Sequence, residues 1–231
     1  METYTIPNTD LAVSRIALGT WAIGGWMWGG TDERRSIETI HAALDKGVTL
    51  IDTAPVYGFG TSEEIVGKAV EEYGGRTNLF LSTKATLEWT DSGQIRRNGS
   101  RDRIMREVED SLKRLRTETI DIYYVHWPDC GRPIAETAKA MRELYDQGTI
   151  RAVGVSNFTQ DQMDAFRGEC PLHLSQPPFN IFERDIEKDI KPYCERNDIA
   201  LMTYGALCRG LLSGKMSKDR EFKGDDLRNN D

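Results

Sequence analysis

The sequence lacks the cysteine and histidine spacing of a metal-binding or disulfide-bonded protein. Its four cysteines form no C-x-x-C pair and have no histidine-rich neighbourhood, so we interpret them as free thiols in a reducing cytoplasm. The first residues are not basic and precede no long apolar run, and no apolar segment approaches the length that crosses a bilayer. These absences predict a cytoplasmic protein with no metal site and no membrane span.

Positive charge and the common nucleotide-binding motifs are also missing. The formal net charge of −7 disfavours nucleic acids and anionic membranes as partners, because both bind basic surfaces. No G-x-G-x-x-G motif follows an expected strand, no P-loop is present, and the glycine pairs 24–25 and 29–30 have neither spacing. A Rossmann-type dinucleotide site and an NTP-hydrolysing enzyme are therefore not predicted.

What is present is a regular alternation of short apolar runs with stretches of helical periodicity. The expected strands are 16–18, 48–51, 79–83, 120–125, 152–155, 172–176 and 200–204, and the expected helices are 32–46, 62–73, 100–115, 134–147, 159–167 and 186–197. We also expect a hairpin within 3–15, a polar loop over 91–98, a loop over 205–214 and Ser62 as a helix N-cap. Pro192 should kink the helix 186–197 or limit its regular part. The pattern predicts one α/β domain with a parallel sheet.

Polar residues follow four of these strands, at the end where ligands bind in parallel α/β folds. They are Asp52, Lys84, His126 and the pair Ser156–Asn157, and Tyr57 comes five residues after Asp52. A phenol titrates near about 10 and an adjacent ammonium lowers that pKa, so Lys84 would make Tyr57 a better proton donor. Asp52 would keep Lys84 charged, and His126, titrating near physiological pH, would orient a carbonyl oxygen and help to relay the proton. The set would protonate an oxygen that is becoming an alkoxide.

Six motifs, in one order along the chain, carry a resemblance to a known enzyme family. They are Leu18–Trp21, Ile51–Gly58, Ser82–Lys84, Asp121–His126, Gly154–Phe158 and Tyr204–Leu212. With these motifs the chain resembles the aldo-keto reductases, most of all their bacterial glycerol dehydrogenase and general-stress-protein branch. The resemblance implies an α/β fold, the (β/α)8 TIM barrel, with residues 1–231 forming a single barrel domain.

The resemblance also implies a site and a reaction. Asp52, Tyr57, Lys84 and His126 would be the catalytic tetrad, with Tyr57 as the general acid/base. The substrate, a small aldehyde, ketone or polyol, would meet a pocket lined by Trp21, Trp26, Tyr57, His126 and Trp127. Hydride would pass from a nicotinamide to the carbonyl carbon while Tyr57 protonates the oxygen, and alcohol oxidation would run in reverse.

The implied cofactor is NADPH or NADP, without excluding NAD. Its carboxamide would bind Ser156, Asn157 and Gln176, and its nicotinamide ring would stack on Tyr204. The full set of implied cofactor-binding residues is Gly19, Thr20, Trp21, Asp52, Ser156, Asn157, Gln176, Tyr204, Gly205, Ala206, Leu207, Arg209, Gly210 and Leu211. Glycine permits close approach of the backbone to a pyrophosphate, and arginine supplies positive charge.

An eighth strand and helix are missing from the pattern. Residues 215–231 are polar, charged and interrupted by glycine, with too few apolar residues for a strand or a core helix. A closed barrel of this type needs eight units, typically about 250 residues. By resemblance, the missing part would carry the eighth βα unit and the basic residues that hold a 2′-phosphate, so we expect a shortened form of a longer protein.

Other interpretations remain beside the reductase. The same fold also serves as a non-catalytic, cofactor-binding sensor or regulatory subunit of ion channels, and the chain could be an inactive fragment. A metal-dependent barrel hydrolase is disfavoured, since no His, Asp and Glu residues have ligand spacing. Trp28 alone would be read as loop packing and Gln176 alone as an ordinary buried hydrogen-bonder. Oligomeric state stays open, although unpaired strand edges would favour association.

Overall fold

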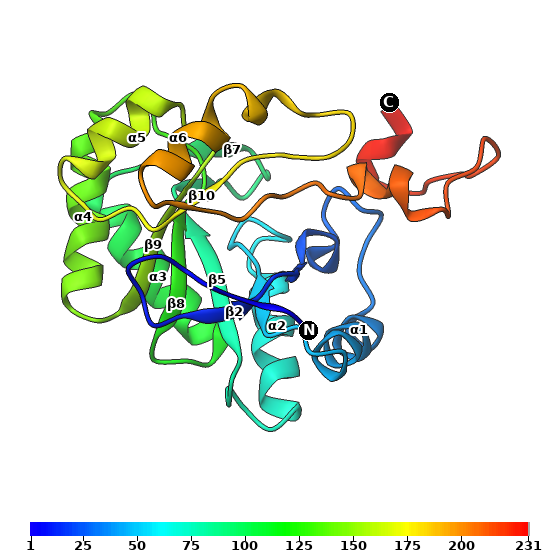
Figure 1. Cartoon of the computed structure of the whole chain (residues 1–231). Helices are drawn as coiled ribbons and strands as arrows, with labels where there is room; N and C mark the ends of the chain where they lie inside the picture. The colour runs from blue at the N-terminus through cyan, green and yellow to red at the C-terminus, as the bar shows by residue number, and fades with distance from the viewer. Residues whose placement is uncertain (231) are drawn as a thin grey trace.

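The computed structural model of the chain describes residues 1–230 (Figure 1). Its centre is a curved sheet of seven parallel strands that neighbour one another in chain order. The strands are β3 (Ala17–Gly19), β4 (Leu50–Asp52), β5 (Phe80–Ala85), β8 (Ile120–Val125), β9 (Ile150–Ser156), β10 (Leu174–Gln176) and β11 (Ala200–Leu201). The predicted parallel α/β fold is confirmed, and no eighth strand joins this sheet within residues 1–230.

A helix connects each strand of this sheet to the next and lies on its outer side (Figure 1). The helices are α1 (Glu33–Asp45), α2 (Thr61–Glu72), α3 (Arg101–Leu115), α4 (Ile134–Asp146), α5 (Gln160–Arg167) and α6 (Ile190–Arg196). Asp32, Ser100 and Thr159 cap α1, α3 and α5 by accepting a backbone N–H with their side chains. The repeated strand-to-helix step brings the carboxyl ends of all the parallel strands to one rim.

The core has an inner and an outer layer because side chains alternate along each strand. In β8, Ile122 and Tyr124 belong to the inner cluster, whereas Tyr123 and Val125 pack outward with α3 and α4. The inner cluster also contains Ile6, Leu11 and Val13, from the hairpin of β1 (Thr3–Thr5) and β2 (Ala12–Ser14). The predicted hairpin therefore exists, and it packs against the inner face of the curved sheet.

A buried ion cluster holds the opposite, amino-terminal end of the sheet. Asp121, at the start of β8, accepts from Arg76, from Arg151 at 2.7 Å and from the backbone N–H of Leu81 at 2.8 Å. Its side chain is only 2% exposed. A buried carboxylate is stable only when it is paired and hydrogen-bonded, and Asp121 has three such partners.

Three expectations about local structure were wrong. The region of the predicted polar loop 91–98 contains a two-stranded hairpin, β6 (Leu87–Trp89) and β7 (Ile95–Arg97). The predicted N-cap Ser62 lies inside α2, which follows Gly60, and its hydroxyl is used for buried contacts described below. The predicted helix 186–197 is a 3-10 turn, η2 (Asp185–Glu187), followed by α6. Its regular part is limited, as one of the two alternatives for Pro192 expected, and Pro192 lies in the first turn of α6, where proline is tolerated.

The carboxyl-terminal part is less regular than the rest. The predicted strand 200–204 shortens to β11, and Tyr204 makes only an isolated parallel bridge to Pro178. The predicted loop 205–214 contains the 3-10 segment η3 (Cys208–Ser213), and Leu227–Asn230 form a further turn, η4. Asp231, the last residue of the predicted barrel domain, lies outside the described residues, so that domain boundary stays a prediction.

No helix among the described residues is long and apolar enough to cross a membrane. The predicted cytoplasmic location is not tested by this finding. At the two ends of the sheet, β3 and β11 each pair with one neighbour only. These are the unpaired strand edges from which we expected association.

Candidate active site

A buried ion pair lies at the carboxyl end of the sheet. β4 and β5 pair in register with Asp52 opposite Ser82. Lys84 lies two residues further along β5 and therefore on the same face as Ser82. The Lys84 ammonium donates to Asp52 Oδ2 and to the Thr53 carbonyl, both at 2.8 Å, and the Ser82 hydroxyl donates to Asp52 Oδ1 at 2.6 Å. Burial acts to lower the pKa of Lys84, but attraction to Asp52 and Tyr57 outweighs it and the pKa is raised. Lys84 is therefore held in its charged form, as predicted.

Tyr57 lies directly against this pair. The Lys84 nitrogen is 5.2 Å from the centroid of the Tyr57 ring. Burial raises the pKa of Tyr57 above that of a free phenol, while Lys84 lowers it and Asp52 raises it. The predicted influence of Lys84 is present, but the predicted net lowering is wrong for this structure, because removing the phenol from water disfavours the phenolate more than Lys84 favours it.

His126 completes the group. Its ring is nearly perpendicular to the Tyr57 ring, with centroids 5.8 Å apart, and its backbone N–H donates to the Ala85 carbonyl. Burial, followed by repulsion from Lys84, holds the pKa of His126 well below its usual range. The prediction that His126 titrates near physiological pH is therefore wrong. A neutral imidazole can still donate one N–H to an oxygen.

Close backbone packing positions Tyr57. A Cβ atom on Gly24 would lie 2.4 Å from the Tyr57 carbonyl carbon, and Gly58, in the left-handed region with φ 66°, packs against Gly24 in turn. Only glycine permits this approach, so the loop after β3 can seat the turn that carries Tyr57. The Ser62 N–H donates to the Tyr57 carbonyl at 3.1 Å and fixes the other side of that turn.

A cluster of buried hydroxyl groups supports the ion pair through the backbone of Asp52. The Ser62 hydroxyl donates to the carbonyl and the hydroxyl of Thr20, the Thr53 hydroxyl donates to Ser62, and the Thr20 hydroxyl donates to the Asp52 carbonyl. Thr20, Thr53 and Ser62 are fully buried. The predicted cofactor residue Thr20 thus has a side chain occupied in supporting Asp52, whereas Gly19 lies opposite Asp52 in β3.

A second polar group occupies the neighbouring strand ends. The Ser156 hydroxyl donates to the Gln176 carbonyl at 2.8 Å, and the Asn157 amide donates to the His126 carbonyl and to Ser156. The Tyr204 hydroxyl donates to Asn157 Oδ1 at 2.9 Å, and Gln176 Nε2 lies 3.3 Å from Asp52 Oδ2. The predicted cofactor residues at this end are therefore connected to one another and to the catalytic group.

The remaining predicted cofactor-binding residues lie in the loop after Tyr204. Its residues Gly205, Ala206, Leu207, Arg209, Gly210 and Leu211 are exposed or half-buried. Arg209 and Gly210 both have left-handed backbones, with φ 51° and 96°. The Arg209 carbonyl accepts from the Arg228 guanidinium at 3.3 Å, so the loop is held by the segment that follows it.

The segment 225–228 packs on the tryptophan-rich loop after β3, although the two are distant in the sequence. The Asp225 carboxylate accepts from the backbone N–H groups of Met27 and Gly29 at 2.8 and 3.1 Å. The Arg228 guanidinium lies 4.8 Å from the centroid of the Trp28 ring. Trp28 also packs edge-on against Trp21, which agrees with its interpretation as a packing residue.

The predicted aromatic pocket residues lie around Tyr57 in two groups. Trp21 is 6.2 Å from the Tyr57 ring, centroid to centroid, and Trp127 directly follows His126. Trp26 packs on Phe59 at 4.9 Å, and Phe59 packs on Trp89 at 5.5 Å. Sequence analysis did not identify Phe59 or Trp89. Phe59 follows Tyr57 by two residues and Trp89 ends β6, and these positions were the available signal. It was missed because the region of the β6–β7 hairpin was interpreted as a loop.

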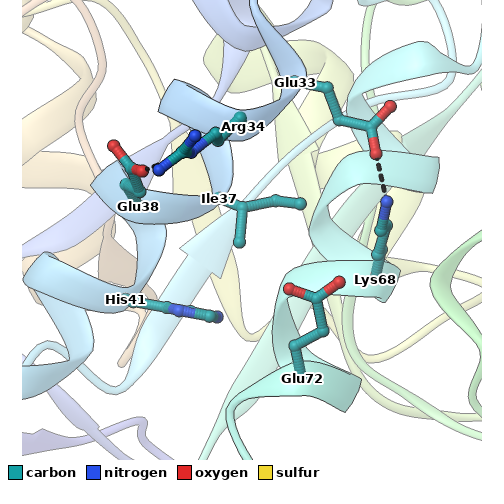
Figure 2. Close-up of a pocket in the computed structure, with 7 residues that line it drawn as sticks. All are labelled: Glu33, Arg34, Ile37, Glu38, His41, Lys68 and Glu72. Carbon is teal, nitrogen blue, oxygen red and sulfur yellow. Dashed lines mark hydrogen bonds and ion pairs between the residues drawn. The ribbon is translucent and has the colours of Figure 1, made fainter.

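A separate hollow lies on the outside, between α1 and α2. It is lined by Glu33, Arg34, Ile37, Glu38, His41, Lys68 and Glu72, with Glu33 paired to Lys68 (Figure 2). None of the predicted site residues belongs to it. Within residues 1–230, no group of three or more His, Cys, Asp or Glu side chains could hold a metal ion.

Comparison with known proteins agrees with the fold. The model of the aldo/keto reductase family matches residues 15–231. The chain is 61% identical over 231 residues to the aldo-keto reductase YhdN of Bacillus subtilis, covering all of this chain and 70% of that protein. It is 38% identical to the NADH-specific methylglyoxal reductase of Escherichia coli, covering 95% of this chain and 71% of that protein.

Among solved structures, the glycerol dehydrogenase AKR11B4 from Gluconobacter oxydans superposes with a TM-score of 0.90 at 55% identity, covering 99% of this chain and 71% of that one. The chain belongs to the aldo/keto reductase family, a family of oxidoreductases. It is shorter than these relatives, which agrees with the absence of an eighth strand and helix from its described sheet.

Proposed function

We propose that this chain carries the catalytic centre of an NADPH-dependent reductase of small aldehydes and ketones, which also oxidises the corresponding alcohols or polyols. The observation that carries the proposal is the buried Asp52–Lys84 pair against the Tyr57 ring, with the His126 ring nearly perpendicular to that of Tyr57. Charge, phenol and imidazole together match the requirements of proton donation to a carbonyl oxygen.

The polar groups at the strand ends fit a nicotinamide. Gln176 Oε1 has no hydrogen-bond partner among the described residues and can accept from a carboxamide, while Ser156 and Asn157 lie beside it. Tyr204 is 39% exposed and its hydroxyl is fixed by Asn157, which suits a ring that stacks on a flat heterocycle. Bound NADPH would supply the hydride that reduces the carbonyl carbon.

Each of the four catalytic candidates then has its own task in the reaction. Tyr57 donates its hydroxyl proton to the carbonyl oxygen, and Lys84 stabilises the phenolate that remains. Asp52 keeps Lys84 charged and fixed. His126, neutral at physiological pH, donates an N–H to the same oxygen and orients it. In alcohol oxidation, the Tyr57 phenolate takes the proton back.

The cofactor preference and the substrate belong to this proposal. We propose NADPH first, and NAD as the alternative, because one relative is named as NADH-specific. Methylglyoxal and the glyceraldehyde–glycerol pair are the first substrates to try, since two relatives are named for such compounds. All belong to the proposed class of small carbonyl compounds and polyols.

The alternatives are a cofactor-binding sensor or regulatory subunit and an inactive fragment. The assembled Asp52, Tyr57, Lys84 and His126 favour the enzyme, because binding a nicotinamide does not require a buried proton-donating pair. A sensor would bind NADPH with no turnover of any carbonyl. An inactive fragment would show neither binding nor turnover until the longer protein was supplied.

The test is NADPH consumption with these aldehydes by the wild type, by Tyr57→Phe and by a control, Tyr73→Phe. Tyr73 is an exposed tyrosine whose hydroxyl donates to Asp45, so the control loses a hydroxyl outside the site. We expect Tyr57→Phe to lose about 10²- to 10⁴-fold in kcat, with the Kd for NADPH unchanged within about twofold. Equal turnover in wild type and Tyr57→Phe would refute Tyr57 as the proton donor.

A further inference from the structure

Thr86 has a backbone conformation that threonine rarely adopts. It lies two residues after Lys84, directly beyond the end of β5, with φ 82°. Such a conformation is an outlier for a β-branched residue, so it persists only where the surroundings impose it. Glycine would adopt it readily. The threonine side chain must therefore contribute something that glycine cannot.

Three contacts impose the conformation, and each joins Thr86 to a different element. Its N–H donates to Glu107 Oε2 of α3 at 2.9 Å, and its carbonyl accepts from the Asn98 N–H just after β7 at 2.9 Å. Its hydroxyl donates to the Trp127 carbonyl, also at 2.9 Å. Thr86 is fully buried, so no water replaces these partners. The hydroxyl contact is the one that glycine would lose.

The partner on α3 is itself held firmly. Glu107 is buried and paired with Arg103, and its other charged or titratable neighbours are Glu63 on α2 and Tyr123 on β8. Arg103 also donates to the Leu87 carbonyl, which begins the β6–β7 hairpin. Thr86 is thus bound to α3, behind the sheet, through its N–H, and to the loop after β8 through its hydroxyl.

Trp127 is held on its other side as well. The Arg97 guanidinium, from β7, lies 4.7 Å from the centroid of the Trp127 ring and donates to the Pro128 carbonyl at 3.3 Å. The preceding residue, His126, donates its N–H to the Ala85 carbonyl, next to Thr86. The backbone and the ring of Trp127 are therefore fixed separately, by the end of β5 and by the hairpin.

We propose that Thr86 is a positioning residue, which orients Trp127 as a wall of the substrate pocket and thereby sets the affinity for the carbonyl substrate. This inference rests on the proposed reductase function, because Trp127 is a pocket residue only in that context. Within residues 1–230, Thr86 makes no hydrogen bond to Tyr57 or to the polar groups that fit the nicotinamide. Its loss should therefore change KM for the carbonyl and leave cofactor binding intact.

The test compares Thr86→Val, which keeps the branched shape and removes the hydroxyl, with Thr86→Ser, which keeps the hydroxyl. We expect KM for the carbonyl substrate to rise about fivefold in Thr86→Val and to stay within about twofold in Thr86→Ser. A fivefold change corresponds to about 1 kcal/mol, the typical net value of one hydrogen bond. The Kd for NADPH should stay within about twofold in both variants.

A second readout needs no turnover. The five tryptophans are labelled with 5-fluorotryptophan, and Trp127→Phe identifies the Trp127 signal in the fluorine NMR spectrum. We expect that signal to move in Thr86→Val and not in Thr86→Ser. An unmoved signal, an unchanged KM in Thr86→Val, or an equal change in KM and in the NADPH Kd would overturn the proposal.

The two levels of inference fail separately. If the wild type reduces no carbonyl, the proposed reductase function is refuted and the substrate-affinity role of Thr86 falls with it. The fluorine signal still decides whether Thr86 orients Trp127. If the wild type is active, only the comparison of Thr86→Val with Thr86→Ser bears on Thr86.

Discussion

Asp52→Asn tests the central physical claim, that a buried carboxylate keeps Lys84 charged beneath the Tyr57 phenol. Asparagine has nearly the same shape but only one oxygen, so it can accept from Lys84 or from Ser82, which donate to different oxygens of Asp52. The variant removes the negative charge and one of these two acceptors. The Lys84 and Asp52 side chains are only 1% and 11% exposed, so water cannot replace the lost partner.

The magnitude follows from that burial. Removing one member of a buried ion pair typically costs about 3–5 kcal/mol. In Asp52→Asn, burial of Lys84 would no longer be outweighed by attraction to Asp52, so the pKa of Lys84 would fall. A neutral Lys84 cannot stabilise the Tyr57 phenolate. We therefore expect kcat for carbonyl reduction to fall by at least about 10²-fold at pH 8.

The sign of the pH dependence identifies the cause. In the wild type the raised pKa keeps Lys84 charged across the assay range. In the variant, Lys84 is charged only below its lowered pKa, so activity should recover as the pH falls from 8 to 6. The measurement is kcat at several pH values, with thermal melting to confirm folding.

Ser82→Ala is the matched control. It removes the 2.6 Å hydrogen bond to Asp52 Oδ1 and leaves the ion pair with Lys84 in place. We expect a kcat loss of less than about tenfold and no new pH dependence. If Asp52→Asn behaves like this control, or loses the same activity at every pH, the charge of Lys84 is not what Asp52 provides.

Three further predictions concern stability and positioning. Burial raises the pKa of Glu107 from 4.5 to about 7. Between these two pH values the folded protein keeps a proton that the unfolded chain has released, so its stability falls as the pH rises from 4.5 to about 7. Urea unfolding should therefore show Glu107→Gln stabilised relative to wild type by up to about 3 kcal/mol at pH 8 and not at pH 4. Gly24→Ala should lower kcat and the melting temperature by displacing the Tyr57 backbone, whereas Gly19→Ala, with nothing within 4 Å of its added methyl group, should keep the melting temperature. Asp121→Ala should lower the free energy of unfolding by about 3–5 kcal/mol with kcat unchanged, because its ion cluster is at the far end of the sheet; a kcat loss at full stability would contradict this.

Most regular elements were predictable because their signals are local. The apolar run of β8 and the helical spacing of α3 predict these elements within a residue of their observed bounds. Once parallel strands are expected, their carboxyl ends must share a rim, so Asp52 and Lys84 could be brought together from sequence alone. The Asp52–Lys84 distance of 2.8 Å shows that this reasoning was sufficient.

Other features depend on contacts that the sequence does not display. The β6–β7 hairpin is polar and short, and Arg103 from α3 stabilises it by donating to the Leu87 carbonyl. Ser62 has the chemistry of an N-cap, but a buried hydroxyl cluster with Thr20 uses it instead. The same residue type serves either task, so only its neighbours decide.

The sequence by itself determined the α/β alternation, the family and the chemical identity of the four catalytic candidates, because periodicity and motif order are properties of the chain. Tertiary structure alone decided how those groups titrate. His126 is neutral and the pKa of Tyr57 is raised because both half-buried rings lose part of their hydration, and this desolvation depends on every element packed around them. It also decided that Thr86 would connect β5, α3 and the loop at Trp127, since three hydrogen bonds from distant parts of the chain meet at one residue.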